Sequence, residues 1–418
     1  MTSDLHTLTT VERYADCSRR QFLGGALAAT AAGSLLGASA TLAEEGPSAP
    51  KRKIKIGLVG CGGRGSWIAS LFQKHGGYQI HAVADYFAPV AEKCGDALGV
   101  DKKRRFSGLS GYKKVIESGV EAAVLIVPPG FIPEHASAAA EAGLHVYMAK
   151  PVAVDVPGCR RIETAGKLAT QNRRAFLVDY QIPTDPGNIE VVKRVRQGAI
   201  GPLAKIMTVG TSGGHIDPPP TGNIESRLQD GIWNYDIALG GSWGVSYDIH
   251  AIDAAVWLLG KTPVAAVGDS RRCRPNPNGS SHDVCSAVFH YADGLIHEHS
   301  GQSLPTGYHN ELSCTALGTH GYAVLNYGGK ARCQPRKEEP FTEEVVDLYP
   351  AGAMRNIAVF YDDITRQRFE NPTAKRAVDG CLTCILEREA GFRHGRLTME
   401  ELLKENRRYE MDLHGLRV

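Results

Sequence analysis

The stretch KIKIGLVGCGGRG, residues 53–65, decides the fold. It begins as a short apolar strand, breaks into a glycine-rich turn and continues into the helical segment SWIASLFQKHGG. Gly60, Gly62 and Gly65 give this turn the spacing GxGxxG. The first glycine permits a tight turn, the second lets the backbone approach a pyrophosphate, and the third lets helix and strand pack closely. The turn therefore predicts a dinucleotide site in which phosphates meet free N–H groups at a helix N-terminus.

An acid at the end of the next apolar run supports the same site. Asp85 closes the run IHAVAD, about 20 residues after Gly65, where a carboxylate accepts hydrogen bonds from a ribose hydroxyl. This placement favours NAD, although Arg64 beside that ribose would tolerate a 2′-phosphate, so NADP stays open as an alternative. The cofactor contacts predicted from this segment are Gly60, Gly62, Gly63, Arg64, Gly65 and Asp85.

The rest of the chain divides into two patterns. Apolar strands at 80–85, 122–127, 145–148 and 175–180 alternate with helical segments, which predicts a doubly wound parallel sheet of the Rossmann type. From about Ala204 the runs are longer and alternate in character, which predicts a mostly antiparallel sheet followed by two closing helices. The fold class is thus α/β, with an N-terminal Rossmann domain and a C-terminal α+β domain.

The N-terminus has the features of an export signal. Arg19 and Arg20 lie in the segment SRRQFL, and no charged residue follows between Gln21 and Ala43. The segment resembles a cleaved twin-arginine signal, which moves proteins that are already folded, although an uncleaved anchor is the alternative. We predict a signal over 1–43, a linker over 44–52, periplasmic or other exported localisation, and only transient membrane contact.

Composition excludes several classes of partner. A net charge of +2 over 418 residues leaves no large basic field, so no nucleic-acid partner is predicted. The ten cysteines are widely spaced, and the CxxC pair Cys381 and Cys384 lies in a helical segment, where two small core residues are expected. No metal site is predicted either, since four histidines that could suggest one lie on several strands with unequal spacing: His282, His297, His299 and His309.

One lysine lies at the predicted ligand-binding edge. Lys150, in HVYMAKPVAVD, directly follows a buried strand, and doubly wound sheets bind ligands at the carboxyl ends of their strands. Pro151 biases Lys150 towards an extended backbone. A lysine here can polarise or protonate the oxygen on a carbon that exchanges hydride. A solvated surface lysine is the alternative.

These segments together resemble the Gfo/Idh/MocA family of sugar and cyclitol oxidoreductases. The resemblance rests on GLVGCGGRG, VPPGFIPEHASAAAEAGLHVYMAKPVAVD, GGSWGVSYDIHAIDAAVWLLG, GTHGYAVL and LTCILEREAGFRHGRLTMEELL, which extend over the whole mature chain. It implies a Rossmann domain over 53–178 and a substrate-binding and oligomerisation domain over 179–418. The second domain would be built on a large open sheet that often serves as a subunit interface, so a homo-oligomer is expected.

The resemblance also implies roles for single residues. Lys150 and His250 would be catalytic, with His250 taking the hydroxyl proton as hydride leaves. Two family carboxylates are replaced, by Ala149 before the lysine and by Ser246 four residues before the histidine. Further cofactor contacts would come from Pro128, His135 and Lys150, and substrate contacts from Tyr180, Gln181, Trp233, Asp248 and Asp253. Tyr180, Tyr235 and His215 are weaker candidates for the additional base that a glycosidase mechanism would need.

Export restricts the chemistry, because free NAD is not expected outside the cytoplasmic membrane. The combined prediction is an exported NAD(P)-dependent oxidoreductase acting on a sugar, glycoside or cyclitol hydroxyl, with tightly bound cofactor and a redox-neutral cycle. Two alternatives remain. An NAD-dependent glycosidase would oxidise, eliminate, hydrate and re-reduce its substrate, and a sugar or nucleotide sensor would have lost activity with the two replaced carboxylates.

Overall fold

The computed structural model describes residues 52–214, 217–220, 224–228, 232–275 and 277–418. The predicted signal over 1–43, nearly all of the linker, and His215 lie outside the described residues. Among the residues that are described, no helix is long and apolar enough to cross a membrane.

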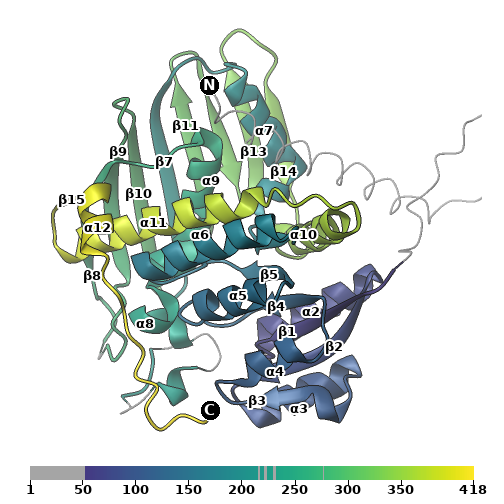
Figure 1. Ribbon diagram of the computed structural model, residues 1–418. Coiled ribbons are helices and arrows are strands. Elements are labelled where there is room, and N and C mark those ends of the chain that lie inside the picture. The colour runs from purple at the N-terminus through teal and green to yellow at the C-terminus, as the bar shows by residue number, and fades with distance from the viewer. Residues whose placement is uncertain (1–51, 215–216, 221–223, 229–231, 276) are drawn as a thin grey trace, which may run out of the picture.

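The first domain is built on a six-stranded parallel sheet (Figure 1). Its strand order is β3-β2-β1-β4-β5-β6: successive strands β1 to β3 extend the sheet in one direction and β4 to β6 in the other, so the strand order reverses between the parallel neighbours β1 and β4. Ligands of such sheets bind in the crevice at this reversal, beyond the carboxyl ends of the strands. The strands are β1 (Ile54–Val59), β2 (Tyr78–Asp85), β3 (Arg105–Ser107), β4 (Ala122–Leu125), β5 (His145–Ala149) and β6 (Phe176–Asp179).

Helices connect these strands, as the alternating pattern predicts. The central strands are buried on both faces, and every residue of β4 is buried, because helices cover both sides of the sheet. Strand β3 and helix α4 were not predicted, since β3 is a short, half-buried edge strand with an arginine and a serine among its three residues. The helices are α2 (Gly63–His75), α3 (Ala88–Leu98), α4 (Gly111–Glu117), α5 (Ile132–Glu141) and α6 (Val156–Gln171).

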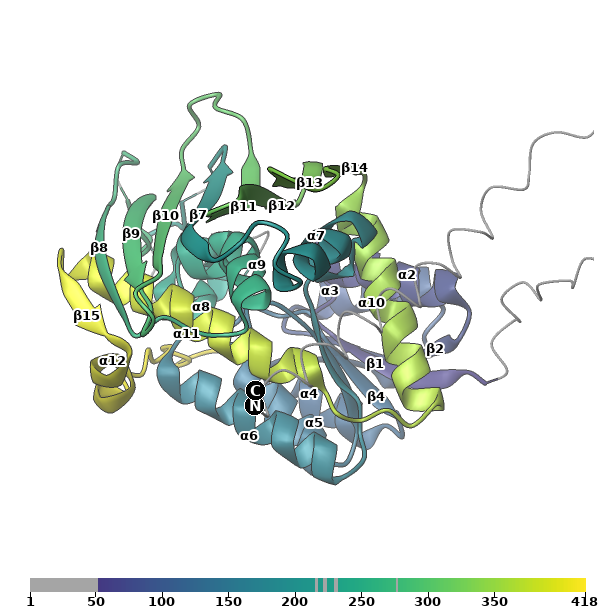
Figure 2. The same ribbon diagram turned by 90° about the horizontal axis from the view of Figure 1, so that it is seen from above.

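The second domain carries a nine-stranded sheet, which confirms the predicted fold class. The strand order is β14-β13-β12-β11-β7-β10-β9-β8-β15; β7 and β10 pair in parallel and the other neighbours are antiparallel. Figure 2 shows helices on one face of this sheet and none on the other. The strands are β7 (Leu203–Ser212), β8 (Ala265–Arg271), β9 (Val284–His290), β10 (Ile296–Ser303), β11 (Glu311–Gly318), β12 (Gly321–Asn326), β13 (Gly329–Pro335), β14 (Phe341–Val345) and β15 (Arg396–Thr398).

The covered face of the sheet meets a helical layer that joins the two domains. Helix α11 packs against α6 of the first domain and against α9 and β8 of the second. Its CxxC cysteines, Cys381 and Cys384, are fully buried, as expected for core residues. Besides α11 (Pro372–Phe392), this part of the chain contains α7 (Pro186–Arg196), α8 (Ile237–Gly240), α9 (Ile249–Leu259), α10 (Leu348–Thr365) and α12 (Met399–Glu405).

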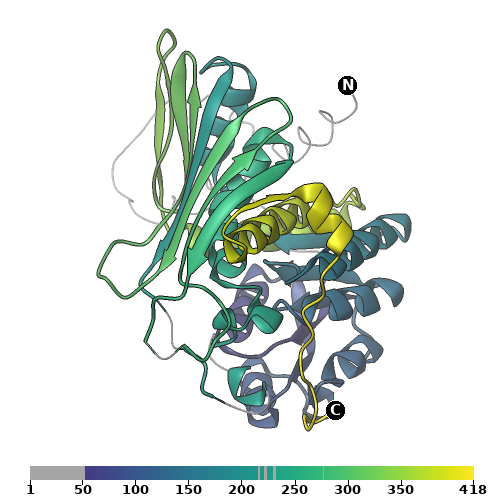
Figure 3. The ribbon, with the colours of Figure 1, turned by 90° about the vertical axis from the view of Figure 1, so that its left-hand side faces the viewer.

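The C-terminal tail after α12 returns to the first domain. Figures 1 and 3 show it running from the second domain to the end of the parallel sheet that holds β3. Tyr409 N donates to the Asp155 carboxylate over 2.8 Å, and Leu109 N donates to Arg417 O over 2.9 Å. The tail therefore runs along the carboxyl edge of the parallel sheet, from the start of α6 to the segment after β3.

Candidate active site

The glycine turn has the geometry that a pyrophosphate needs. Gly60 has a φ of +93°, and a Cβ at this position would overlap the Ile126 carbonyl. A Cβ on Gly65 would overlap the Gly60 carbonyl, so the helix could not approach the strand. Gly62, the N-cap of α2, and Gly63 are exposed and face open space. The turn is therefore closed on the side of the strand and open on the side where phosphates bind.

Asp85 lies at the end of β2, next to the glycine turn. Its Oδ2 atom accepts a hydrogen bond from Cys61 N over 2.8 Å, and Oδ1 accepts one from Phe87 N over 3.0 Å. These bonds hold the carboxylate at the crevice, where each oxygen still has a lone pair for a ribose hydroxyl. The residues present thus fit a nicotinamide dinucleotide.

Arg64 occupies a different place from the one expected. Its guanidinium forms an ion pair with Asp179 over 2.6 Å and donates to the Tyr349 hydroxyl over 2.6 Å. Asp179 ends β6, and three strands separate β6 from β2, so this guanidinium is distant from Asp85. The expectation that Arg64 lies beside the adenosine ribose and tolerates a 2′-phosphate is therefore wrong for this arrangement. The arginine instead supports the opposite, nicotinamide end of the crevice.

Lys150 directly follows β5 at that same end. The peptide bond from Lys150 to Pro151 is cis, and Nζ donates to the Ser246 carbonyl over 2.5 Å. Burial, and then the charge of Arg64, lower the pKa of Lys150 to about 7. Near neutral pH this amine is therefore present in both protonation states, which suits a group that exchanges protons.

His250 lies in the first turn of α9 and shares this environment. It is 8% exposed, and its Nδ1 atom has no hydrogen-bond partner among the described residues. Its ring meets the Tyr327 ring at 4.9 Å and the Tyr180 ring at 6.5 Å, both edge to face. Burial, then the charges of Lys150 and Arg64, lower its pKa well below the usual value. His250 is therefore a neutral imidazole, close enough to Lys150 to respond to its charge.

Ala149 and Ser246 occupy positions where the family has carboxylates, but two other carboxyl groups lie near Lys150. Asp179 and Asp248 both act on Lys150 in the direction that raises its pKa, against burial and Arg64. Asp179 is fully buried and accepts a hydrogen bond from Asn356 over 2.8 Å in addition to the Arg64 ion pair. The ammonium form of Lys150 is therefore opposed by burial and Arg64 and favoured by these two carboxyl groups, although burial also raises the pKa of Asp248 well above its usual value.

The residues predicted to contact substrate separate into two groups. Tyr180 and Gln181 are buried beside His250, and Gln181 accepts a hydrogen bond from the Tyr327 hydroxyl over 3.2 Å. Asp253 is fully buried and paired with Arg376 over 3.0 Å, so its position is that of a structural carboxylate. Trp233 packs in a separate apolar cluster with the C-terminal tail. The structure thus brings Lys150, His250, Tyr180 and Gln181 together, with the Asp253–Arg376 pair packed against Tyr180 and Trp233 in a separate cluster.

The remaining predicted residues occupy various positions. Pro128 follows β4 at the crevice, with its carbonyl accepting from Phe131 N. His135 is stacked on Tyr112 with ring centroids 4.0 Å apart, and burial lowers its pKa to about 4. Tyr235 is buried, with its hydroxyl 2.7 Å from that of Ser303. Asp248 lies beneath the lysine in a buried cluster with Cys285 and His299.

The tail covers the end of the crevice next to Asp85. Tyr86 follows Asp85, its hydroxyl accepts a hydrogen bond from Arg417 N over 3.2 Å, and the Arg417 guanidinium lies 5.4 Å from its ring centroid. Leu416 is 7% exposed. A separate apolar cluster forms here from the tail, the segment between β7 and the end of α8, and the residues that follow β2, β3 and β4: Ile224, Leu239, Leu416, Tyr86, Leu109, Phe131, Leu228, Trp233 and Met411.

Sequence reasoning missed several of these contributors. The sequence could have indicated Asp179, because this residue ends a buried parallel strand at the same sheet edge as Lys150. No sequence pattern indicates Tyr327 or the C-terminal tail, since they come from segments far along the chain that only the tertiary fold brings to the crevice.

Comparison with known proteins identifies the class. Residues 54–180 match the model of an oxidoreductase family with an NAD-binding Rossmann fold, named GFO_IDH_MocA, and residues 189–324 match the C-terminal domain of the same family. Together these matches extend over more than half of the chain. The chain belongs to the Gfo/Idh/MocA oxidoreductases and is an NAD-binding enzyme.

The individual relatives are only distantly similar to this chain in sequence. The chain is 25% identical over 269 residues to a myo-inositol dehydrogenase, Hyg17, from Streptomyces leeuwenhoekii, covering 64% of this chain and 74% of that one. It is 24% identical over 298 residues to an inositol 2-dehydrogenase of Rhizobium meliloti (strain 1021), covering 70% and 78%.

Solved structures share the fold at lower identity. An aldose-aldose oxidoreductase from Caulobacter crescentus, complexed with glycerol, matches with a TM-score of 0.67 and 20% identity, covering 83% of this chain and all of that one. A levoglucosan dehydrogenase complexed with NADH and levoglucosan has a TM-score of 0.68 at 16% identity, also over 83% and 100%.

Proposed function

We propose that this protein is an exported NAD-dependent oxidoreductase that transfers hydride between the nicotinamide and a CH–OH carbon of a sugar, glycoside or cyclitol. The observation that carries the proposal is the meeting of Lys150 and His250 at the nicotinamide end of the crevice, with a lysine pKa of about 7. The names of the relatives, which are inositol, aldose and levoglucosan enzymes, favour a polyhydroxylated substrate.

Different residues of the chain bind the cofactor and handle the hydroxyl proton. When bound, NAD accepts hydride from the hydroxyl-bearing carbon. Gly62 and Gly63 leave room for its phosphates, and Asp85 binds the ribose hydroxyls. Lys150 in its neutral form takes the hydroxyl proton, or in its charged form polarises that oxygen. The neutral imidazole of His250 offers a second hydrogen bond to the same hydroxyl or its neighbour.

Export adds a constraint on turnover. The twin-arginine segment SRRQFL suits cargo that folds around its nucleotide before translocation. A cofactor carried in this way must be restored within each cycle, so the oxidation of one hydroxyl would be followed by the reduction of a second substrate. The tail over the adenosine end of the crevice supports retention, because it adds contacts that a leaving nucleotide must displace.

The protein isolated from its own export route tests this proposal. A denatured extract should contain NAD by mass spectrometry, and addition of a sugar or cyclitol should produce bound NADH that a second carbonyl compound reoxidises. Absence of nucleotide, with turnover on added NAD, would refute the trapped cofactor but leave the oxidoreductase. Release of an aglycone from glycosides would instead indicate glycosidase chemistry, and sugar binding without any hydride transfer would refute the enzyme.

A further inference from the structure

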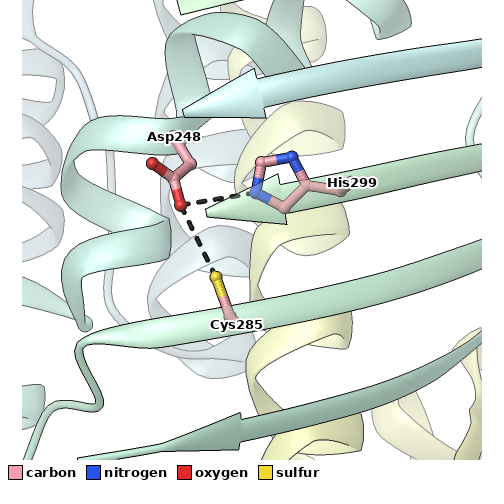
Figure 4. A group of neighbouring side chains, drawn as sticks. All are labelled: Asp248, Cys285 and His299. Atoms are coloured by element: carbon pink, nitrogen blue, oxygen red, sulfur yellow. Dashed lines mark hydrogen bonds and ion pairs between the residues drawn. The ribbon is translucent and has the colours of Figure 1, made fainter. Parts of the chain in front are cut away.

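A cluster of side chains of the kinds that bind metals lies near the active-site lysine; two of them, Asp248 and His299, are buried, and Cys285 is half-buried. Figure 4 shows Asp248, Cys285 and His299 pointing towards one another. Asp248 comes from the π-helical turn Gly244–Asp248, Cys285 from β9 and His299 from β10. One ligand atom from each of the three lies within 4.8 Å of the others. Three separate elements thus direct a carboxylate, a thiol and an imidazole to one point.

The distances within the cluster are those between ligands of one ion. Asp248 Oδ2 lies 3.3 Å from His299 Nε2 and 3.6 Å from Cys285 Sγ. Around a tetrahedral zinc with bonds of about 2.0 Å to N or O and about 2.3 Å to S, neighbouring ligand atoms are about 3.3 Å apart for N and O, and about 3.6 Å for O and S. The apo geometry therefore needs little change to accept such an ion.

Glu387 of α11 lies beside these three residues and offers a carboxylate as a candidate fourth ligand. Its Oε1 atom lies 3.9 Å from His299 Nε2, and the side chain is 3% exposed. Two carboxyl groups, Asp248 and Glu387, are thus buried side by side, and Asp248 Oδ1 has no hydrogen-bond partner among the described residues. Burying two carboxylates together is costly unless a positive charge compensates them. A divalent cation is the compensation that this ligand set accepts.

The surrounding structure is shaped for the cluster. Gly210 of β7 and Gly301 of β10 are paired in the sheet, and a Cβ on either one would collide with the Asp248 carboxylate. Thr208 Oγ1 lies 2.9 Å from His299 Nδ1, which leaves Nε2 directed at Asp248. A hydrogen bond to the second ring nitrogen is the usual way in which proteins orient a metal-bound histidine.

We propose that Asp248, Cys285, His299 and Glu387 bind a structural zinc ion. A thiolate and an imidazole together select zinc over magnesium or calcium. With four protein ligands the site is closed, so the ion stabilises the fold and does not activate water. It holds the π-helical turn in which the Ser246 carbonyl accepts the hydrogen bond of Lys150. The ion is thus a positioning element for the catalytic lysine, and the proposal does not depend on the identity of the substrate.

Metal content of the full chain tests the site. Protein purified with a histidine-free tag, supplied with zinc and then dialysed, should retain about one zinc ion per chain by mass spectrometry. Cys285→Ser should lose most of it. Cys333→Ser is the matched control, because Cys333 is a free, buried cysteine of the same sheet, with β12, β11 and β7 between its strand and β10.

A spectroscopic readout keeps the test valid if the variant is less stable. Cobalt substituted into the wild-type protein should show the visible bands of a tetrahedral site and a thiolate charge-transfer band, and the latter should be absent in Cys285→Ser. Wild-type protein with less than about a tenth of an equivalent of zinc, and no cobalt spectrum, would overturn the proposal. Full metal retention by Cys285→Ser would overturn it as well.

Discussion

At the scale of the residue, the site depends on how burial changes the charge of one lysine. Burial and Arg64 lower the pKa of Lys150, while four further groups that face it are titratable or charged: Asp179, Asp248, Cys384 and His250. Since Arg64 is itself paired with Asp179, their charges act on this pKa in opposite directions, and desolvation is the largest effect. The lysine therefore titrates near neutral pH, where its neutral form can accept a proton from the substrate.

This balance predicts the pH dependence of the reaction. Below pH 7 Lys150 is mainly an ammonium and cannot accept the hydroxyl proton, so kcat/KM for alcohol oxidation should rise with pH to a plateau, with a midpoint near 7. Lys150→Met should lose this limb and ~10²–10⁴-fold in rate, while still binding NAD. Lys167→Met, on the exposed side of α6, is the control. An unchanged profile in Lys150→Met would contradict the assigned role.

Asp253 provides a second test at this scale. Because it is fully buried and paired with Arg376, Asp253→Asn should lower the free energy of unfolding by roughly 1–3 kcal/mol and leave the KM for substrate unchanged. Asp293→Asn, which alters an exposed ion pair with Lys261, should change neither. A raised KM with unaltered stability would show that Asp253 contacts the substrate after all. Chemical denaturation and steady-state kinetics measure both quantities.

At the scale of the element, different glycines of the turn between β1 and α2 are required for folding and for cofactor binding. Gly65 is required for close packing of helix and strand, whereas Gly62 faces open space with a φ of −62° that alanine adopts readily. The same residue type thus serves two purposes within one turn.

Alanine substitutions distinguish these purposes. Gly62→Ala should keep the melting temperature of the wild type and weaken NAD binding about tenfold or more, because the methyl group occupies the path of the phosphates. Gly65→Ala should lower the melting temperature, since its Cβ overlaps the Gly60 carbonyl. Thermal unfolding and NAD titration decide the matter; equal effects of the two variants on stability would refute the distinction.

The C-terminal tail is the second element with a predicted role. Leu416 is 7% exposed in the cluster beside Tyr86, while Leu413 is 37% exposed. We expect Leu416→Ala to loosen the tail and to speed the release of NAD several-fold, and Leu413→Ala to leave it unchanged. Stopped-flow displacement of the bound nucleotide measures both rates. Slower release from Leu416→Ala would mean that the tail blocks the nucleotide and does not retain it.

At the scale of the whole molecule, α11 and the helical layer around it tie the two sheets together. The layer covers one face of the nine-stranded sheet, and the other face is open in Figures 2 and 3. Apolar side chains are exposed on this open face, at Val267, Ile296 and Tyr322. We expect this open face to bind a second copy of the chain, because contiguous exposed apolar side chains mark interaction surfaces.

This surface predicts the oligomeric state. The protein should elute as a homo-oligomer in light-scattering chromatography, and Ile296→Glu should shift it towards the monomer by placing a charge in the interface. Val346→Glu is the control, because Val346 is 67% exposed but follows β14 outside the strands of the sheet. A monomeric wild-type protein, or an Ile296→Glu variant that stays assembled, would refute this interface.

The sequence by itself determined the fold class, the glycine turn and the cofactor type. Those features depend on local periodicity and on residues within one strand-turn-helix unit, where chain neighbours are also neighbours in space. It did not determine β3, which is too short and polar for a pattern, nor the direction of the Arg64 side chain.

Only the tertiary structure decided which distant groups meet. The pairing of Arg64 with Asp179, the burial of Asp253, the tail over Tyr86 and the cluster of Asp248, Cys285, His299 and Glu387 all join residues far apart in the chain. Such contacts depend on how two sheets and a helical layer pack, and the low dielectric of that packed interior then sets the charges of Lys150 and His250.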